Sequence, residues 1–137
     1  MNRCGPRRLV LMMVAALLVA ACSSGDEVAV TTTSSEVALS DLVADWDNGQ
    51  LFLQITDDGS YQTLATATSD PNDPLMGGFV ARDGVNLIFV TNIYGECAGQ
   101  TGVYEVLMTD SQLILTLVDD PCQFRATRFV DPWQKSG

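Results

Sequence analysis

Four cysteines are the residues of this chain with the most distinctive chemistry. Cys22 follows Val19-Ala20-Ala21 at the end of an uncharged run. This arrangement is typical of a bacterial lipobox, in which the cysteine thiol takes a diacylglyceryl group before the chain is cleaved in front of it. We therefore expect Cys22 to become the lipidated first residue of the mature protein, with the lipid as its membrane anchor.

The residues before Cys22 have the pattern of a signal peptide. Arg3, Arg7 and Arg8 form a cationic start, and residues 9–21 carry no charge. A helix over that run would be about 20 Å long, which is too short for the roughly 30 Å of a bilayer's hydrocarbon core. We expect residues 1–21 to be a lipoprotein signal-peptide helix that is removed, although the small residues before the cut also suit ordinary signal peptidase.

The cysteine count supports lipidation of Cys22. Cys4 leaves with the leader, so lipidation leaves Cys97 and Cys122 as one pair, whereas an ordinary Cys22 would leave an odd thiol. Export to an oxidising compartment permits a disulfide between them. We predict a Cys97–Cys122 disulfide and an extracytoplasmic location at the outer side of the bacterial membrane, in the cell envelope.

Composition excludes several classes of function. The chain has no histidine, which removes the commonest general base and zinc ligand and makes a Ser-His-Asp triad impossible. Loss of the leader leaves 17 acidic residues against four cationic ones, a balance that disfavours nucleic acid as a partner. Oxygen ligands at Asp70, Asn72, Asp73 and Asp119-Asp120 do not have the spacing of a recognised calcium loop. We predict no enzyme, no catalytic residue, no cofactor and no metal.

The composition and the hydrophobic pattern of the sequence change after residue 40. Residues 22–40, rich in Ser and Thr, are expected to form a flexible tether. From residue 41 to residue 133, short alternating runs separated by turn residues indicate an all-β domain, and residues 134–137 are expected to be a frayed tail. Eight strands are predicted, near residues 43–46, 50–56, 61–68, 77–82, 85–92, 102–109, 112–118 and 123–130.

Tight turns and longer loops alternate between these strands. In an antiparallel meander, alternate connections lie at the same end, so Cys97 and Cys122 should meet at the end with the longer loops. In the hairpin of residues 102–118, Tyr104, Val106 and Met108 should face Leu113, Leu115 and Leu117. Closure into a small barrel would protect the sheet edges, but a β-sandwich has the same periodicity and stays open as the alternative.

The meander with Ala44-Asp45-Trp46 in its first strand resembles a shortened lipocalin-type (calycin) barrel. In that family a Gly-x-Trp opens the first strand and a late arginine packs on the tryptophan; here alanine replaces the glycine. The resemblance implies that Arg125 or Arg128 packs on Trp46. Pairing with an aspartate of the domain, or with the carboxylate of a ligand, are the other roles open to them. A more specific resemblance is to small bacterial lipoproteins with lipocalin-like domains. The residues that carry it are Asp58-Gly59-Ser60-Tyr61, Cys97 with Gly102-Val103-Tyr104, and the run 113–117 followed by Asp119-Asp120-Pro121-Cys122 and Arg125.

Lipocalin-like barrels imply a small, often apolar ligand. The residues that could line its cavity are Tyr61, Phe89, Tyr104, Met108 and Phe124. The same side chains could instead fill the barrel, because eight strands enclose just enough space for side chains. The leading hypothesis is a lipid-anchored domain that binds a small apolar or amphipathic molecule. The alternative is an interaction or structural module of the cell envelope that contacts another protein and has a filled barrel with no such ligand.

Overall fold

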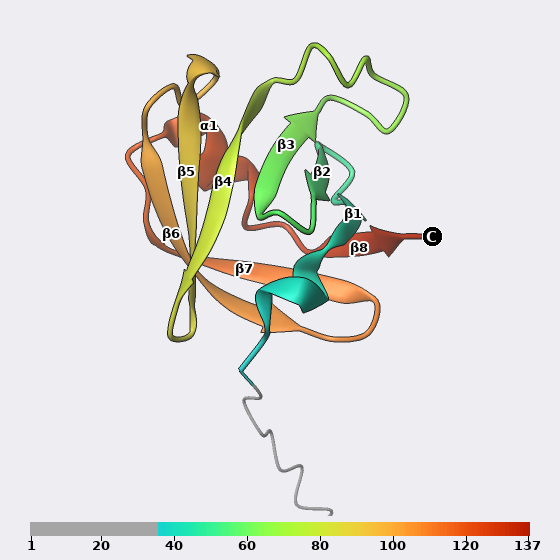
Figure 1. Ribbon diagram of the computed structural model, residues 1–137, viewed down its shortest axis with the longest axis vertical. Coiled ribbons are helices and arrows are strands. Elements are labelled where there is room, and N and C mark those ends of the chain that lie inside the picture. Colours follow the sequence, from blue (N-terminus) through green and yellow to red (C-terminus); the bar gives the residue numbers. More distant parts are fainter. Residues whose placement is uncertain (1–35) are drawn as a thin grey trace, which may run out of the picture. The chain divides into compact units, whose positions relative to one another are not determined.

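A computed structural model describes residues 36–137, which form a closed antiparallel barrel of eight strands in sequential order (Figure 1). The prediction of an eight-stranded meander closed into a barrel is therefore confirmed, and the sandwich is not. The signal peptide, Cys22 and most of the tether lie outside the described residues.

A 3₁₀ helix, η1 (Leu39–Leu42), precedes the barrel and a six-residue helix, α1 (Gln123–Arg128), lies between the last two strands. The strands are β1 (Ala44–Asp47), β2 (Phe52–Ile55), β3 (Ser60–Leu64), β4 (Met76–Asp83), β5 (Asn86–Gly95), β6 (Thr101–Met108), β7 (Gln112–Asp119) and β8 (Trp133–Ser136). The strands run from four residues in β1, β2 and β8 to ten residues in β5.

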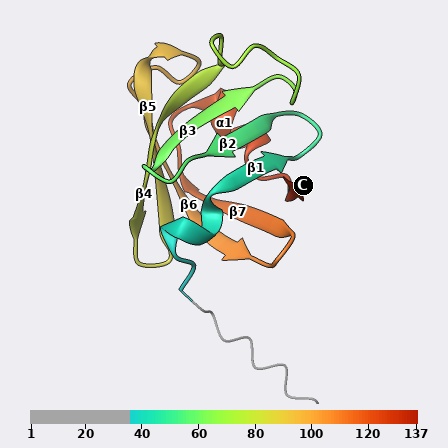
Figure 2. The same ribbon diagram turned by 45° about the vertical axis from the view of Figure 1, so that its right-hand side comes forward.

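The connections divide between the two ends of the barrel as predicted. The tight turns after β2, β4 and β6 lie at one end, together with η1 (Figure 2). Residues 65–75, 96–100 and 120–132, the last of which include α1, lie at the other end (Figure 1). Cys97 and Cys122 meet there in a disulfide with their Cα atoms 5.3 Å apart, which confirms the predicted pair.

The hairpin of β6 and β7 has the predicted register. Tyr104 pairs with Leu117, Val106 with Leu115 and Met108 with Leu113. Alternation along a strand sends successive side chains to opposite faces, so Tyr104, Leu113 and Leu115 are buried inside the barrel. The pairing of β6 with β7 shifts between Val103 and Tyr104, which indicates a local bulge at that point.

The position of the eighth strand was predicted wrongly. Residues 123–130 contain α1 instead, in which the backbone N–H of Phe129 donates to the carbonyl of Arg125. Helical geometry puts residues four apart on one face, so Arg125 and Phe129 are both buried. The closing strand is β8, in the segment expected to fray, and it pairs with both β1 and β7. Trp133 anchors it, because its indole is buried.

Candidate functional site

The centre of the barrel is occupied by aromatic side chains. Phe89 lies edge to face with Tyr61, with ring centroids 5.1 Å apart, and with Tyr104 at 5.8 Å. It makes a third such contact with Phe129 at 5.2 Å, and Phe129 continues to Trp133 at 5.3 Å. All five rings are buried, and edge-to-face pairs of this kind stabilise a core beyond the area they bury.

Three of the five residues predicted to line a cavity therefore meet in this aromatic cluster, where they contact one another. The other two lie elsewhere. Met108 is half-buried at the tight-turn end, and Phe124 is half-buried on α1. Sequence reasoning missed Phe129 and Trp133, since it placed Phe129 in a strand and Trp133 next to the tail.

A buried arginine lies beside the aromatic cluster. The side chain of Arg125 is 0% exposed. Its Nε donates to Oδ2 of Asp120 at 2.5 Å and its Nη2 to Oδ1 at 3.0 Å, which is a bidentate ion pair. Its Nη1 donates to Oγ1 of Thr91 at 2.6 Å and to the carbonyl of Phe89 at 3.3 Å. A buried guanidinium is tolerated because its donors have acceptors in this way.

Asp120 receives hydrogen bonds from three directions. Besides those from Arg125, it accepts the hydroxyl of Tyr104 at 2.6 Å and the backbone N–H of Cys122 at 2.8 Å. Burial on its own would raise the pKa of Asp120, but the hydrogen bonds from Arg125, Tyr104 and Cys122 outweigh it and the pKa is lowered. Burial raises the pKa of Tyr104, and its hydrogen bond to Asp120 raises it further. This polar cluster closes the long-loop end of the barrel next to the disulfide.

Gly102 makes the ion pair sterically possible. A Cβ at this position would lie 2.2 Å from Oδ2 of Asp120 and 2.8 Å from Nε of Arg125. We expect Gly102→Ala to displace both groups and to lower the free energy of unfolding by about 1 to 3 kcal/mol, as overpacking does. Urea denaturation measures the change. Gly99→Ala is not a suitable control because Gly99 has a positive φ, whereas Ala81→Gly adds no atoms to the cluster and reports on strand propensity alone.

The pH dependence of stability should follow Asp120. Its lowered pKa means that the folded state holds the carboxylate ionised more strongly than the unfolded chain does. That stabilisation is present above the unfolded pKa of about 3.9 and is lost as the pH falls through the lower folded pKa. Urea denaturation from pH 7 to pH 3 should show Asp120→Asn weakened at pH 7 and approaching the wild type in acid. The exposed neighbour substitution Asp119→Asn should leave the wild-type profile unchanged, and a constant gap between Asp120→Asn and wild type would contradict the account.

The arginines do not have the partners that the family resemblance implied. Arg125 pairs with Asp120, the aspartate role that the sequence left open. The guanidinium of Arg128 lies 4.0 Å from the centroid of the Phe124 ring. The cation over Trp46 is Lys135 of β8, with its Nζ 5.9 Å from the ring centroid. The wrong position of the eighth strand explains the difference, because it is β8 and not α1 that lies beside β1.

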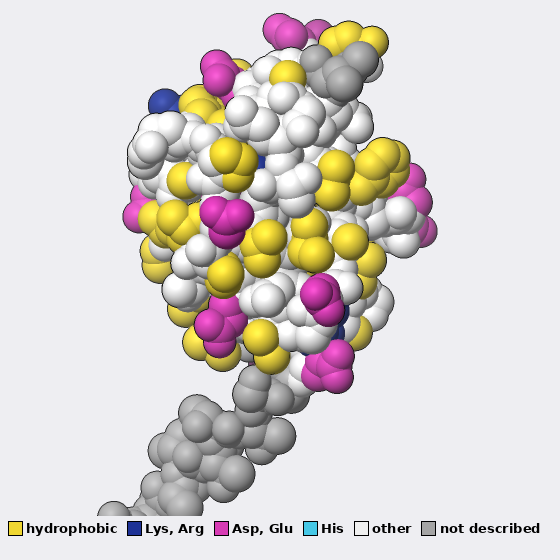
Figure 3. Space-filling model, turned by 90° about the vertical axis from the view of Figure 1, so that its left-hand side faces the viewer, with side chains coloured by type: hydrophobic (Ala, Val, Ile, Leu, Met, Phe, Trp, Pro, Cys, Tyr) yellow, Lys and Arg dark blue, Asp and Glu magenta, His cyan; other side chains and the backbone are white. Residues whose placement is uncertain are grey.

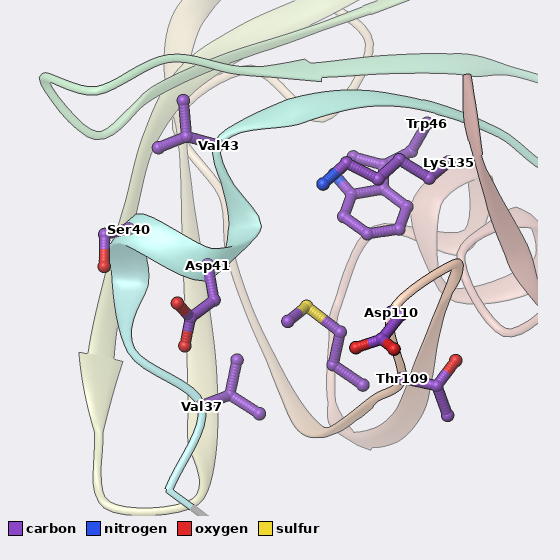
Figure 4. Close-up of a pocket in the computed structure, with 9 residues that line it drawn as sticks. Val37, Ser40, Asp41, Val43, Trp46, Thr109, Asp110 and Lys135 are labelled. Atoms are coloured by element: carbon purple, nitrogen blue, oxygen red, sulfur yellow. The ribbon is translucent and has the colours of Figure 1, made fainter. Parts of the chain in front are cut away.

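A groove opens at the tight-turn end of the barrel, and we call it the end groove. Its volume is about 480 Å³. Figure 4 shows Val37 and Asp41 on the η1 side and Thr109 and Asp110 on the β6–β7 turn across from them. Trp46, Met108 and Lys135 also line it, but the indole N–H of Trp46 is already used by the carbonyl of Leu42 at 3.0 Å. The end groove is wide, mostly polar and outside the aromatic cluster.

The acidic loops hold their own backbone in place. Oδ1 of Asp70 accepts the backbone and side-chain N–H groups of Asn72 at 2.9 and 3.0 Å. Within residues 36–137, no group of three or more acidic or cysteine side chains is arranged to hold a metal ion. The same residues include no helix that is long and apolar enough to cross a membrane.

Comparison of the chain with protein-family models, curated proteins and solved structures finds no match. The fold and the polar cluster identify the architecture of the protein. It is a small closed β-barrel, compatible with the lipocalin type, with one end shut by a disulfide and a buried ion pair.

Proposed function

We propose that this protein is a lipid-anchored component of the bacterial cell envelope whose filled barrel acts through its outer surface as an interaction module. The observation that carries the proposal is the occupied interior. Tyr61, Phe89 and Tyr104, the residues best placed to line an internal ligand site, contact one another instead. Phe129 and Trp133 extend the same buried cluster.

The shut long-loop end supports the same function. In a ligand-binding barrel one mouth must admit the ligand. Here Arg125 reaches across that end to Thr91 and to the backbone of Phe89, while Asp120 fixes its other side. Breaking such a pair is costly, so entry of a ligand past Arg125 would be strongly unfavourable.

The anchoring part of the proposal rests on Cys22. The disulfide supports it, because the bond uses both of the other cysteines that follow the predicted leader. Lipid chains at Cys22 would hold the protein at the membrane, since each buried methylene contributes about 0.8 kcal/mol and two or more chains anchor stably.

Intact-mass analysis of the full-length chain produced in a bacterium tests the anchor. We expect a membrane-associated polypeptide that starts at Cys22 and carries the added mass of a diacylglyceryl group. Cys22→Ser should remove that mass and release the protein from the membrane fraction. Ser23→Ala is the matched control and should change neither property. A mature protein with an unmodified Cys22 thiol would overturn the anchoring.

A second candidate function is the binding of a small amphipathic molecule, and the end groove is the observation that favours it. The groove combines the apolar side chains of Val37 and Met108 with the charges of Asp41, Asp110 and Lys135. A molecule that stays bound to the extracted protein and is lost on Met108→Glu, but not on Gln62→Glu, would favour this function. Equal retention by both variants would place the molecule elsewhere.

A further inference from the structure

The outer surface of the barrel has two unlike sides. On β1, β2 and β3, the outward residues Asp45, Gln54 and Gln62 are neighbours across the strands. They are polar and bonded to one another, with Nε2 of Gln54 donating to Asp45 at 3.2 Å and Nε2 of Gln62 donating to Gln54 at 2.5 Å. This is the surface that a sheet facing water usually presents.

In the middle of β4, β5 and β6, several neighbouring outward residues are apolar. Phe79 pairs with Val90, Ala81 with Ile88, and Ile88 with Val103. These five neighbouring residues form what we call the apolar patch, and Figure 3 shows hydrophobic side chains gathered on this side of the molecule. Phe79 is 56% exposed and Val90 42% exposed. An apolar cluster on the outside of a barrel contributes little to the core and is typical of an interaction site.

The charges beside the apolar patch are negative. Glu105 follows Val103 on the same side of β6, between the patch and exposed Leu107, and it pairs with Asn86 of β5. Asp83 ends β4 on the same side and is exposed. None of the four cationic residues among residues 36–137 belongs to the apolar patch. Arg125 is buried and Arg82 pairs with Glu36. Arg128 lies over Phe124, and Lys135 is on β8.

A groove extends the apolar patch toward the long-loop end. Two residues before Phe79 on β4 is Gly77, and two residues after Val90 on β5 is Asn92; both line this groove, which has a volume of about 410 Å³. Asp73 contributes a carboxylate to its wall and Tyr94, which is 76% exposed, contributes an aromatic ring. A carboxylate beside an exposed ring suits a lysine or arginine side chain, through charge and cation–π attraction.

We propose that the apolar patch is the docking surface for a protein partner whose contact face is apolar at its centre and carries lysine or arginine at its edge. Charge complementarity selects this occupant. A second copy would bring Glu105 and Asp83 against the same acidic side chains, and anionic lipid headgroups would be repelled in the same way. The inference rests on the proposed function, since it names the part of the outer surface through which the interaction module acts.

Photo-crosslinking from single positions tests the proposal in the full-length protein, in the membranes of the cells that make it. A photoreactive amino acid replaces Val90 in the apolar patch, and Gln54 at a matched outward strand position on the polar side. Phe79 serves as a second patch position in case the Val90 variant does not fold. We expect an adduct of one defined mass from position 90 or 79 and none from position 54. The crosslinked partner segment should carry lysine or arginine next to apolar residues. Glu105→Lys should reduce the adduct yield roughly tenfold or more, the loss that corresponds to one reversed charge contact.

Several results would overturn the proposal. An adduct with a second copy, with lipid, or with residues 22–35 of the same chain would assign another occupant to the patch. An acidic partner segment, or an undiminished yield with Glu105→Lys, would refute the charge argument. An adduct from position 54 alone would refute the patch but leave the interaction module standing. Absence of protein adducts from all three positions would count against both.

Discussion

Arg125→Met is expected to lower the free energy of unfolding by about 3 to 5 kcal/mol. Methionine fills most of the same volume, so the loss comes from Asp120, whose side chain is also 0% exposed and would be left as an uncompensated buried carboxylate. Thr91 and the carbonyl of Phe89 would also lose the hydrogen bonds that Nη1 of Arg125 donates to them. Urea denaturation with the disulfide intact measures the change.

Arg128→Met is the matched control on the same helix. Arg128 is half-buried and its guanidinium contacts the Phe124 ring, so its loss should cost about 0.5 to 1 kcal/mol. The double substitution Arg125→Met with Asp120→Leu should recover part of the loss, because it removes both charges together. Equal effects of Arg125→Met and Arg128→Met would contradict the role of the buried ion pair.

Removal of the disulfide is expected to have an effect of similar size. The cysteines are 25 residues apart, and closing a loop of that length contributes about 3 to 4 kcal/mol in the chain-entropy account. The bond also ties the loop after β5 to the residue before α1, where the backbone N–H of Cys122 donates to Asp120. Its loss therefore loosens the polar cluster that shuts the barrel.

The double variant Cys97→Ser/Cys122→Ser measures this contribution by urea denaturation. Wild-type protein in a thiol reductant should approach the double variant, and the reductant should leave the double variant itself unchanged. Ser substitution removes the bond with little change of volume, so packing is not the cause of the loss. Identical stability of wild type and double variant would show that the bond does not constrain the fold.

Much of this fold could be predicted because its information is local. Alternation and turn residues determine the β6–β7 hairpin, in which Tyr104, Val106 and Met108 face the predicted partners. The alternation of tight turns and longer loops determines which ends the connections occupy. The same parity brings Cys97 and Cys122 together, and the structure confirms their bond.

The eighth strand could not be predicted because two periods fit the same residues. Phe124 and Ala126 alternate with polar neighbours like a strand, whereas Arg125 and Phe129 are four apart like a helix face. Only the contacts of the closed barrel select the second pattern, by burying Arg125 against Asp120 and Phe129 against Phe89. The composition does not indicate that Arg125 is buried, because arginine is among the residues least often buried.

The wrong position of the eighth strand also limited the prediction of the candidate site. Tyr61, Phe89 and Tyr104 were expected to face the interior, and they do. Whether they surround a space or pack against further side chains depends on Phe129, which was predicted to lie in the eighth strand, and on Trp133, which was predicted to be the last residue of the domain. In the structure these two side chains join the buried cluster, where Phe129 packs on Phe89 and Trp133 packs on Phe129. This packing is the basis of the proposal that the protein acts through its outer surface.

Native mass spectrometry of the full-length protein extracted from its membrane tests the filled barrel most directly, because it measures the mass of the protein together with any bound small molecule. A filled barrel with a lipidated Cys22 predicts the mass of the processed chain, its covalent lipid and one disulfide, with no further small molecule. A single small molecule bound to each chain, retained by Met108→Glu in the end groove and released by Phe89→Trp in the barrel centre, would contradict it.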